Sequence, residues 1–261
     1  MKKLILHIGK IIVLIGINPK KIFYSLIGIP KFLKDATWFF KNRRNLANQN
    51  FRLSFFPVLG ENLNNSASLD KAYFFQDQWA ARRVYDKNPT NHADIGSRID
   101  GFVGNLLTFR KVKVFDIRPL DCKIHNLEFI EKDFMKSAEH YYNSFDSVSC
   151  LHALEHFGLG RYGDSLDING WKYGLKNLAL LIKSEGNLYL SVPIGKQRIE
   201  FNAHRIFNTS TIISEAKKHK LMLEHFSFID DAGVYHSNYS LDDANNANYG
   251  CGCFEFTKLI G

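Results

Sequence analysis

The alternation of hydrophobic and polar positions changes along the chain, and the change indicates where its main domain lies. From residue 92 onward, short apolar runs alternate with turns and with helical spacing, at 92–95, 113–116, 127–130, 145–150, 171–182 and 186–193. Short apolar runs bounded by turns are typical of buried strands, whereas the spacing at 171–182 is helical. This order predicts an α/β fold with a doubly wound, mostly parallel sheet that binds ligands at the carboxyl ends of its strands.

The head of the chain follows a different pattern, which predicts an added helical N-terminal region. Residues 4–17 are apolar apart from His7 and Lys10, and they fall short of the roughly 20 residues that span a bilayer. Lysines precede this run as in a signal peptide, but no small-residue cleavage site follows it. We expect the N-terminal region to cover residues 1–60 and the main domain residues 61–261, with the polar loop 60–68 at the boundary.

Residues 19–41 have the pattern of a basic amphipathic helix. Apolar residues at helical spacing lie among lysines in this segment, namely Ile22, Leu26, Ile29, Leu33 and Trp38. Helices of this kind cover a neighbouring domain, form an interface with a second chain or lie on an anionic membrane surface. The sequence leaves four alternatives open: packing within the protein, a homodimer, peripheral membrane contact through residues 1–44, and insertion into the membrane.

The net charge of +8 is concentrated at this head. Residues 1–52 contain eleven Lys or Arg and one acidic residue, whereas the rest contains 23 basic and 25 acidic residues. A nucleic-acid enzyme carries its positive field beside its active site, so we expect no nucleic-acid partner. The four cysteines lack the spacing of a disulfide scaffold. They predict reduced thiols in a cytoplasmic protein, at the inner face of the membrane if the head binds lipid.

Polar residues at the ends of the predicted strands suit a nucleoside. Gly96 lets the backbone approach a ligand closely, and the neighbouring Asp94 can hold an amino-acid group. Asp116 ends the second strand and can accept both hydrogen bonds of a ribose diol, and Asp133 can face an adenine amino group. A carboxylate at the second strand end also occurs in nicotinamide-binding folds, so it does not select the cofactor by itself.

Longer motifs resemble those of class I (Rossmann-like) S-adenosylmethionine-dependent methyltransferases. The segments 146–156, which ends in Leu-His-Ala-Leu-Glu-His, and 181–188 match the fourth and fifth motifs of that class. The resemblance covers residues 90–210 and includes His-Arg-Ile-Phe at 204–207. It implies S-adenosylmethionine as the cofactor. It also implies a set of cofactor-binding residues: Asp94, Gly96, Asp116, Ile117, Asp133 and His152.

A narrower resemblance is to a small subfamily of unknown function found among bacterial surface-polysaccharide, or capsule, genes. It is carried by the segments 94–97, 116–120, 151–164, 191–195 and 201–205. This resemblance implies a role in modifying a glycan or capsule. The chain departs from the wider class in its glycine-rich loop, where Arg98 and Asp100 occupy later glycine positions.

Four residues after the fourth and fifth strands are candidates for the acceptor side. His156 titrates near operating pH and is the predicted base for an acceptor hydroxyl, or else a histidine bonded to backbone at a helix end. Asp164 is a second base, a group that orients a histidine, or part of a turn. His204 and Arg205 point to the same mouth, where Arg205 binds a phosphate or carboxylate or forms a surface ion pair. The His and Asp residues here match no metal-ligand spacing, so we expect no metal.

These observations predict methyl transfer from S-adenosylmethionine to an oxygen of a sugar, nucleotide sugar or phosphate-bearing precursor of a bacterial surface polysaccharide. One alternative is an NAD-dependent sugar oxidoreductase, which needs a phosphate-cradling glycine loop where this chain has Arg98. The other is a catalytically inactive, methyltransferase-like assembly protein, which the altered loop and the basic head favour.

Overall fold

The computed structural model describes residues 16–42, 59, 70–201 and 203–260. The chain divides into two units, Met1–Leu69 and Asp70–Gly261. The predicted apolar run at 4–17, apart from its last two residues, and the predicted boundary loop at 60–68 lie outside the described residues. In the part of the chain that the structure describes, no helix is both long and apolar enough to cross a bilayer.

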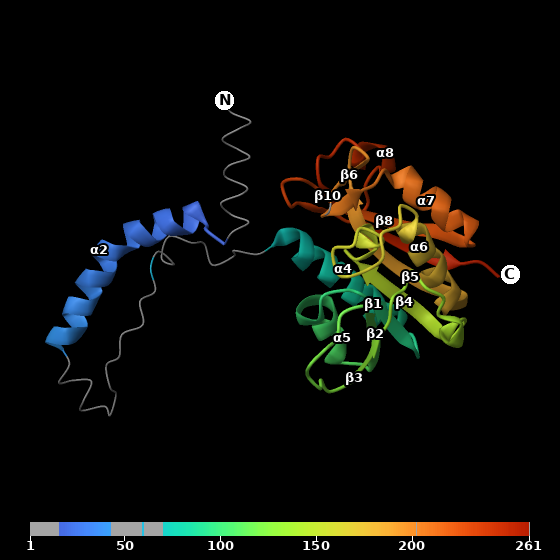
Figure 1. Cartoon of the computed structure of the whole chain (residues 1–261), viewed down its shortest axis with the longest axis horizontal. Coiled ribbons are helices and arrows are strands. Elements are labelled where there is room, and N and C mark those ends of the chain that lie inside the picture. Colours follow the sequence, from blue (N-terminus) through green and yellow to red (C-terminus); the bar gives the residue numbers. More distant parts are fainter. Residues whose placement is uncertain (1–15, 43–58, 60–69, 202, 261) are drawn as a thin grey trace. The chain divides into compact units, whose positions relative to one another are not determined.

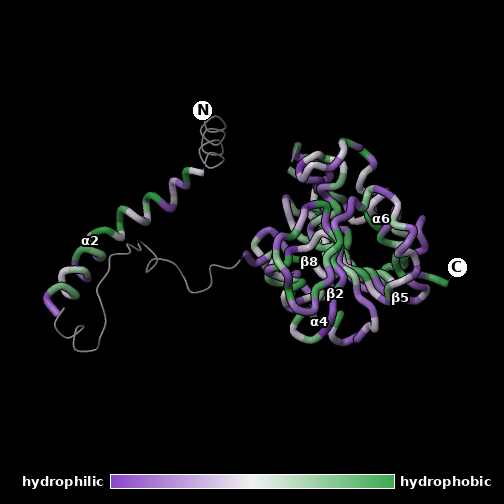
Figure 2. The backbone as a smooth tube through the Cα atoms, turned by 60° about the horizontal axis from the view of Figure 1, so that its bottom comes forward, coloured by the Kyte–Doolittle hydropathy of each residue, from purple (hydrophilic) through white to green (hydrophobic). Residues whose placement is uncertain are grey.

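The described part of the first unit is helix α2 (Pro19–Lys41), as the pattern predicted. Asn18 caps it by accepting a hydrogen bond from the backbone N–H of Lys21 at 3.0 Å, and Pro19 at the first helical position has its backbone angle already set for a helix. Hydrophobic and hydrophilic residues alternate along α2 (Figure 2). The helix is therefore amphipathic.

The second unit is built on an eight-stranded sheet with the strand order β3-β2-β1-β4-β5-β10-β8-β9 (Figure 1). Its strands are β1 (His92–Ile95), β2 (Val112–Asp116), β3 (Leu127–Glu131), β4 (Phe145–Leu151), β5 (Ile182–Ile194), β8 (Leu221–Ile229), β9 (Tyr235–His236) and β10 (Gly250–Lys258). Neighbours from β3 to β5 are parallel. Strand β10 is antiparallel to both β5 and β8. The predicted mostly parallel sheet is confirmed, with one reversed strand inside it.

Helices cover both faces of this sheet (Figure 1). On one face lie α4 (Lys71–Lys87), the short π-helical turn η2 (Ile99–Val103) and α5 (Gly104–Leu107). Trp79, Phe102 and Leu106 are buried there against Tyr189 of β5. On the other face α6 (Gly170–Leu181) and α7 (Thr209–Lys218) bury residues such as Leu175 and Ile212. Burial of these large side chains is the main force that holds the three layers together.

Short elements after the strands complete the fold and shape the end of the sheet at which a ligand is expected. They are η3 (Glu139–Tyr141), η4 (Leu154–His156), α8 (Leu241–Ala244) and the two strands of a small hairpin, β6 (Arg198–Glu200) and β7 (His204–Ile206). Turn η4 follows β4, and the hairpin follows β5. Since β4 and β5 are parallel neighbours, η4 and the hairpin emerge at the same edge of the sheet.

Candidate active site

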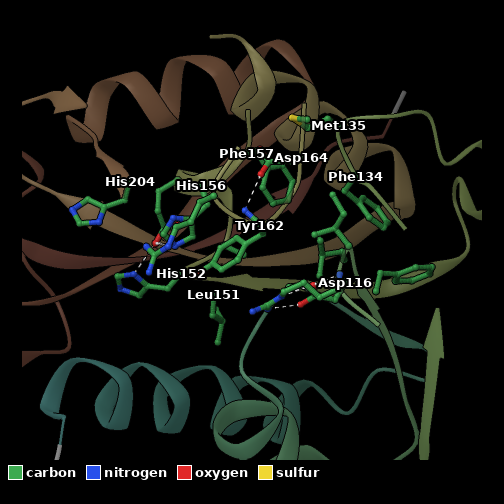
Figure 3. A pocket seen from close by; sticks show the side chains of 18 of the residues that line it. Asp116, Phe134, Met135, Leu151, His152, His156, Phe157, Tyr162, Asp164 and His204 are labelled. Atoms are coloured by element: carbon green, nitrogen blue, oxygen red, sulfur yellow. Dashed lines mark hydrogen bonds and ion pairs between the residues drawn. The ribbon is translucent and has the colours of Figure 1, made fainter. Parts of the chain in front are cut away.

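A cavity of about 490 Å³ opens at the carboxyl ends of β1, β2 and β4 (Figure 3). Eight of the ten predicted site residues line it, namely Gly96, Asp116, Ile117, Asp133, His152, His156, Asp164 and His204. Figure 3 shows Asp116 and Phe134 on one side, the three histidines on the other and Tyr162 between them. We call these sides the carboxylate end and the histidine end.

Gly96 forms the floor beside β1 for two geometric reasons. Its φ of +72° lies in the left-handed region, where a side chain causes strain. A Cβ at this position would lie 2.9 Å from the Cβ of Ala153, closer than two carbon atoms pack. Only glycine fits here, and the predicted close approach of a ligand to this backbone stays a prediction.

The carboxylate end has apolar walls and two acids. Ile117, Phe134 and Met135 line it. Asp133 Oδ1 accepts a hydrogen bond from the backbone N–H of Met135 at 2.9 Å, and its side chain is 16% exposed. Apolar walls with a few fixed polar groups are typical of small-molecule sites. A flat aromatic base with an amino group matches this end.

An arginine covers the second acid at this end. Arg118 Nε donates to Asp116 Oδ1 at 3.0 Å, and Nη2 donates to Oδ2 at 2.8 Å. The backbone N–H of Arg118 also donates to Oδ1 at 2.9 Å. The guanidinium lies 4.5 Å from the centre of the Tyr162 ring. Both oxygens of the predicted ribose-binding carboxylate therefore hold a guanidinium in this structure.

Asp94 is placed differently from the prediction. Its side chain is fully buried and accepts hydrogen bonds from the hydroxyls of Ser97 and Ser149, each at 2.6 Å, and from the backbone N–H of Ser97 at 3.1 Å. Burial raises the pKa of Asp94 to about 6, against these hydrogen bonds. Asp94 thus holds the turn that carries Gly96 and lies behind the cavity wall. The predicted direct contact with a cofactor is not supported by this geometry.

The histidine end contains a buried ion pair that was not predicted from the sequence. Glu155 is 1% exposed, and its Oε1 lies 2.9 Å from Nδ1 of His152. Burial by itself favours the neutral forms, but the neighbouring Cys251 and the Glu155 carboxylate raise the pKa of His152 above its ordinary value, and His152 lowers the pKa of Glu155. Oε2 of Glu155 has no hydrogen-bond partner among the described residues. The motif Leu-His-Ala-Leu-Glu-His contained the signal, since an acid in an apolar segment needs a partner.

The His156 ring is held by a backbone contact in an environment that favours its neutral form. Its Nδ1 lies 2.7 Å from the carbonyl oxygen of Ala203, which fixes the proton on that nitrogen and leaves a lone pair on Nε2. Burial lowers the pKa of His156, although the Glu155 carboxylate acts in the opposite direction. Nε2 lies 3.7 Å from Oε1 of Glu155. The structure therefore shows the backbone bond that was the alternative interpretation of His156, and its role as a base stays a prediction.

His204 comes to the same end from strand β7. Its ring centre lies 6.4 Å from that of His156 and 5.0 Å from that of Tyr249. Its Nε2 lies 3.3 Å from Oε2 of Glu200, and burial lowers the pKa of His204. The hairpin thus brings together two histidines that are 48 positions apart in the sequence.

Asp164 shapes the loop between them. Its carboxylate accepts hydrogen bonds from the backbone N–H groups of Gly158 at 2.7 Å, Gly160 at 3.2 Å and Tyr162 at 3.2 Å. Gly158 has a φ of +79°, and a Cβ there would lie 2.0 Å from a backbone oxygen of Asp167. Of the roles considered for Asp164, the turn is the one this geometry supports, because its oxygens are already engaged.

Arg205 is also placed differently from the prediction. It is 4% exposed and donates four hydrogen bonds at 2.6–3.4 Å to the carbonyl oxygens of Glu155, Phe157, Asp167 and Ile168. These bonds fasten β7 to η4 and to the loop that follows. The predicted contact with a phosphate or carboxylate is replaced by a structural role.

Arg161 is a cation at this end that was not predicted from the sequence. It lines the cavity, donates from Nη1 to the carbonyl oxygen of Ala203 at 3.0 Å, and lies 5.2 Å from the centre of the Tyr162 ring. Among the described residues no carboxylate pairs with it, whereas Arg98 and Arg118 each bind an aspartate. No group of three His, Cys, Asp or Glu side chains in the described ranges has an arrangement that holds a metal ion.

Solved structures similar to this chain include methyltransferases. One is the 1,6-didemethyltoxoflavin-N1-methyltransferase of Burkholderia thailandensis, with bound 1,6-didemethyltoxoflavin and S-adenosylhomocysteine. It is 12% identical, with 73% of this chain and 80% of that chain covered at a TM-score of 0.53. The N-methyltransferase NodS of Bradyrhizobium japonicum WM9 is 14% identical, with 74% and 100% covered at a TM-score of 0.52.

The same fold also carries other chemistry. The [4+2]-cyclase SpnF is 12% identical to this chain, with 76% of this chain and 86% of that chain covered at a TM-score of 0.55. At such identities the likeness establishes the fold, and a function has to be argued from the site. No curated protein matches the sequence.

A protein-family comparison matches residues 108–238. This range contains cavity residues from both the carboxylate end and the histidine end. The family carries no assigned function. Because the match spans half of the chain, the chain belongs to the family described as Caenorhabditis protein of unknown function, DUF268.

Proposed function

We propose that this protein is a cytoplasmic S-adenosylmethionine-dependent O-methyltransferase. We further propose that its acceptor is a sugar, nucleotide sugar or phosphate-bearing precursor of a bacterial surface polysaccharide. The observation that carries the proposal is the arrangement of one cavity, with Asp116 and Asp133 at one end and the neutral base His156 at the other. The link to surface glycans rests on the resemblance of the sequence motifs.

The residues at the carboxylate end fit the nucleoside part of this cofactor. The side-chain-free floor at Gly96 admits a ligand close to the backbone, Asp116 offers two acceptors to a ribose diol, and Asp133 offers one to an amino group. Ile117 and Phe134 supply apolar contact. Arg118 has to leave Asp116 when a diol binds there, because the guanidinium engages the same two oxygens.

The residues at the histidine end fit a hydroxyl acceptor. The cofactor supplies an electrophilic methyl group on a sulfonium sulfur when it is bound. The chain's own contribution is to hold the acceptor oxygen in line and to take its proton, and Nε2 of His156 has the lone pair for that proton. Oε2 of Glu155 is a buried acceptor without a partner among the described residues. A ligand that brings O–H donors satisfies both atoms.

Arg161 supports the phosphate-bearing form of the acceptor. A guanidinium that lines a cavity and has no carboxylate partner in the described part of the chain suits a ligand phosphate. Arg161 lies on the same loop as Tyr162. The centre of the Tyr162 ring is 5.3 Å from the centre of the His156 ring. In this proposal Arg161 takes the role that the sequence assigned to Arg205.

The sheet itself distinguishes between the two nucleotide-binding alternatives. The dinucleotide-binding fold has six parallel strands in the order 3-2-1-4-5-6. Here an antiparallel strand, β10, lies between β5 and β8. The position of Arg98 in the turn after β1 also leaves no glycine cradle for a pyrophosphate. The oxidoreductase alternative therefore has less support than methyl transfer.

Cofactor binding is the first test. Purified protein is titrated by calorimetry with S-adenosylmethionine and S-adenosylhomocysteine, and with NAD and NADP as comparison ligands. We expect a Kd on the order of micromolar for the sulfur nucleosides. We expect Asp116→Ala to weaken binding about 100-fold, because the variant loses two charge-assisted hydrogen bonds. Asp121→Ala is the matched control, since it removes an exposed acid from the loop after the same strand.

Each outcome of this titration selects one hypothesis. Binding of NAD alone would move the assignment to the oxidoreductase. Absence of binding to any of the four would favour the inactive assembly protein. If the sulfur nucleosides bind, transfer of labelled methyl groups to neutral sugars and to nucleotide sugars follows. Arg161→Ala is expected to reduce transfer to the phosphate-bearing acceptors and leave the cofactor Kd unchanged.

A further inference from the structure

Helix α2 has a stripe of apolar side chains along one face. Residues three or four positions apart lie on the same side of a helix. Ile22, Leu26, Ile29, Leu33, Ala36 and Phe40 follow that spacing without interruption. The large side chains among them are 37–61% exposed. Exposure of a continuous apolar stripe to water is unfavourable, so the stripe is expected to contact an apolar partner.

The other side of α2 is positively charged. The helix contains five lysines, namely Lys20, Lys21, Lys31, Lys34 and Lys41, and a single acid, Asp35, which forms an ion pair with Lys31. At about 100° per residue, Lys31 and Lys34 lie about 180° and about 120° from Ile22 around the axis. Trp38 and Phe39 are also exposed near the end of the helix. Apolar, aromatic and cationic groups thus occur together along one helix.

From this arrangement we propose that α2 binds the surface of an anionic lipid membrane and lies parallel to it. The acyl region accepts the apolar stripe, and lipid phosphates attract the lysines. The helix does not cross the bilayer, because it is not apolar enough to do so.

A second copy of the chain is one competing occupant, and charge argues against it. The apolar spacing of α2 also fits a two-helix seam. Two copies of α2 would, however, bring together lysine-rich helices that each contain a single acid, Asp35. An anionic surface satisfies both the apolar stripe and the lysines, whereas a second copy satisfies only the stripe. This inference does not depend on the proposed methyl transfer.

The test is sedimentation of the full-length protein with vesicles. Vesicles of phosphatidylcholine alone are compared with vesicles that also contain phosphatidylglycerol. We expect binding to the second kind only, and weaker binding at high salt. Each lysine near an anionic surface changes the affinity roughly five-fold, so replacing Lys21, Lys34 and Lys41 by Glu is expected to weaken binding at least about 100-fold.

Two further variants identify what the helix contacts. The matched control replaces Lys123, Lys196 and Lys217 by Glu, which reverses the same charge on exposed residues of the second unit, and we expect little loss. Leu26→Asp with Leu33→Asp is expected to abolish binding through the apolar stripe. Circular dichroism checks that each variant is folded. The proposal is overturned if the wild type does not bind anionic vesicles or if the lysine variant binds them as well as the wild type does. It is also overturned if the wild type binds no vesicles and ultracentrifugation shows a dimer that the leucine variant alone disrupts.

Discussion

Removing the guanidinium of Arg118 is expected to increase the affinity for the nucleoside. In the structure the Arg118 side chain engages both oxygens of Asp116, at 3.0 and 2.8 Å. A ribose diol at this carboxylate requires the same oxygens. Any ligand that binds there must therefore first separate the ion pair, and the free energy of that separation reduces its affinity.

The magnitude follows from the exposure of the pair. The Arg118 side chain is 52% exposed and that of Asp116 is 13% exposed, and pairs of this kind contribute at most about 1 kcal/mol. The contact with the Tyr162 ring at 4.5 Å contributes roughly 0.5–1 kcal/mol at an exposed site. The total of about 1–2 kcal/mol corresponds to a gain in affinity of about 5–30-fold in Arg118→Ala.

Calorimetric titration with S-adenosylhomocysteine measures this gain directly. Salt provides a second readout, because ions weaken the exposed pair. The wild type is expected to bind more tightly as salt rises, and Arg118→Ala is expected to show no such change. Arg118→Lys is the control that keeps the charge but loses the two-pronged geometry. Weaker binding by Arg118→Ala would refute the reasoning, because Arg118 would then be a ligand contact and not a competitor.

Three other variants test the remaining parts of the site. His156→Asn is expected to lower kcat/KM about 100-fold and to remove the loss of activity at acid pH, where the lowered pKa of His156 is reached; the exposed His125→Asn is the control in the pH profile. Arg205→Met is expected to lower the free energy of unfolding by about 3 kcal/mol in urea, because buried carbonyl groups lose their donor; unchanged stability would contradict its structural role. Burial raises the pKa of Asp94 to about 6, above its value of about 3.9 in the unfolded chain. The contribution of this group to the free energy of unfolding is therefore greatest below pH 4, and about 3 kcal/mol of it is lost as the pH rises to 7. Asp94→Asn lacks this loss. The free energy of unfolding of the variant, measured in urea, should therefore rise relative to that of the wild type between pH 4 and pH 7. A difference that stays constant over this range would show that Asp94 does not titrate there.

The strands from β1 to β5 with helix α6, and several of the residues at the strand ends, could be predicted from the sequence, whereas α7, β8 and β9 were not predicted. Gly96, Asp116 and Asp133 follow three predicted strands, and they reach one cavity because parallel strands end at a common edge. His156 and His204 follow the next two strands and reach the other end of the same cavity for the same reason. Hydrophobic spacing is a local property, so it can be read without knowledge of the fold.

The direction and the partners of individual side chains were decided only by the tertiary structure. Asp94 lies opposite Ser149 in the register of β1 and β4, which buries its carboxylate among hydroxyls. Arg205 is surrounded by carbonyl groups from segments 37–50 positions earlier in the chain. Glu155, Arg118 and Arg161 lie within recognised motifs, yet their roles depend on neighbours from other elements. A strand end places a residue at the mouth of the sheet, but long-range packing and hydrogen bonding determine whether its side chain faces the ligand or the core.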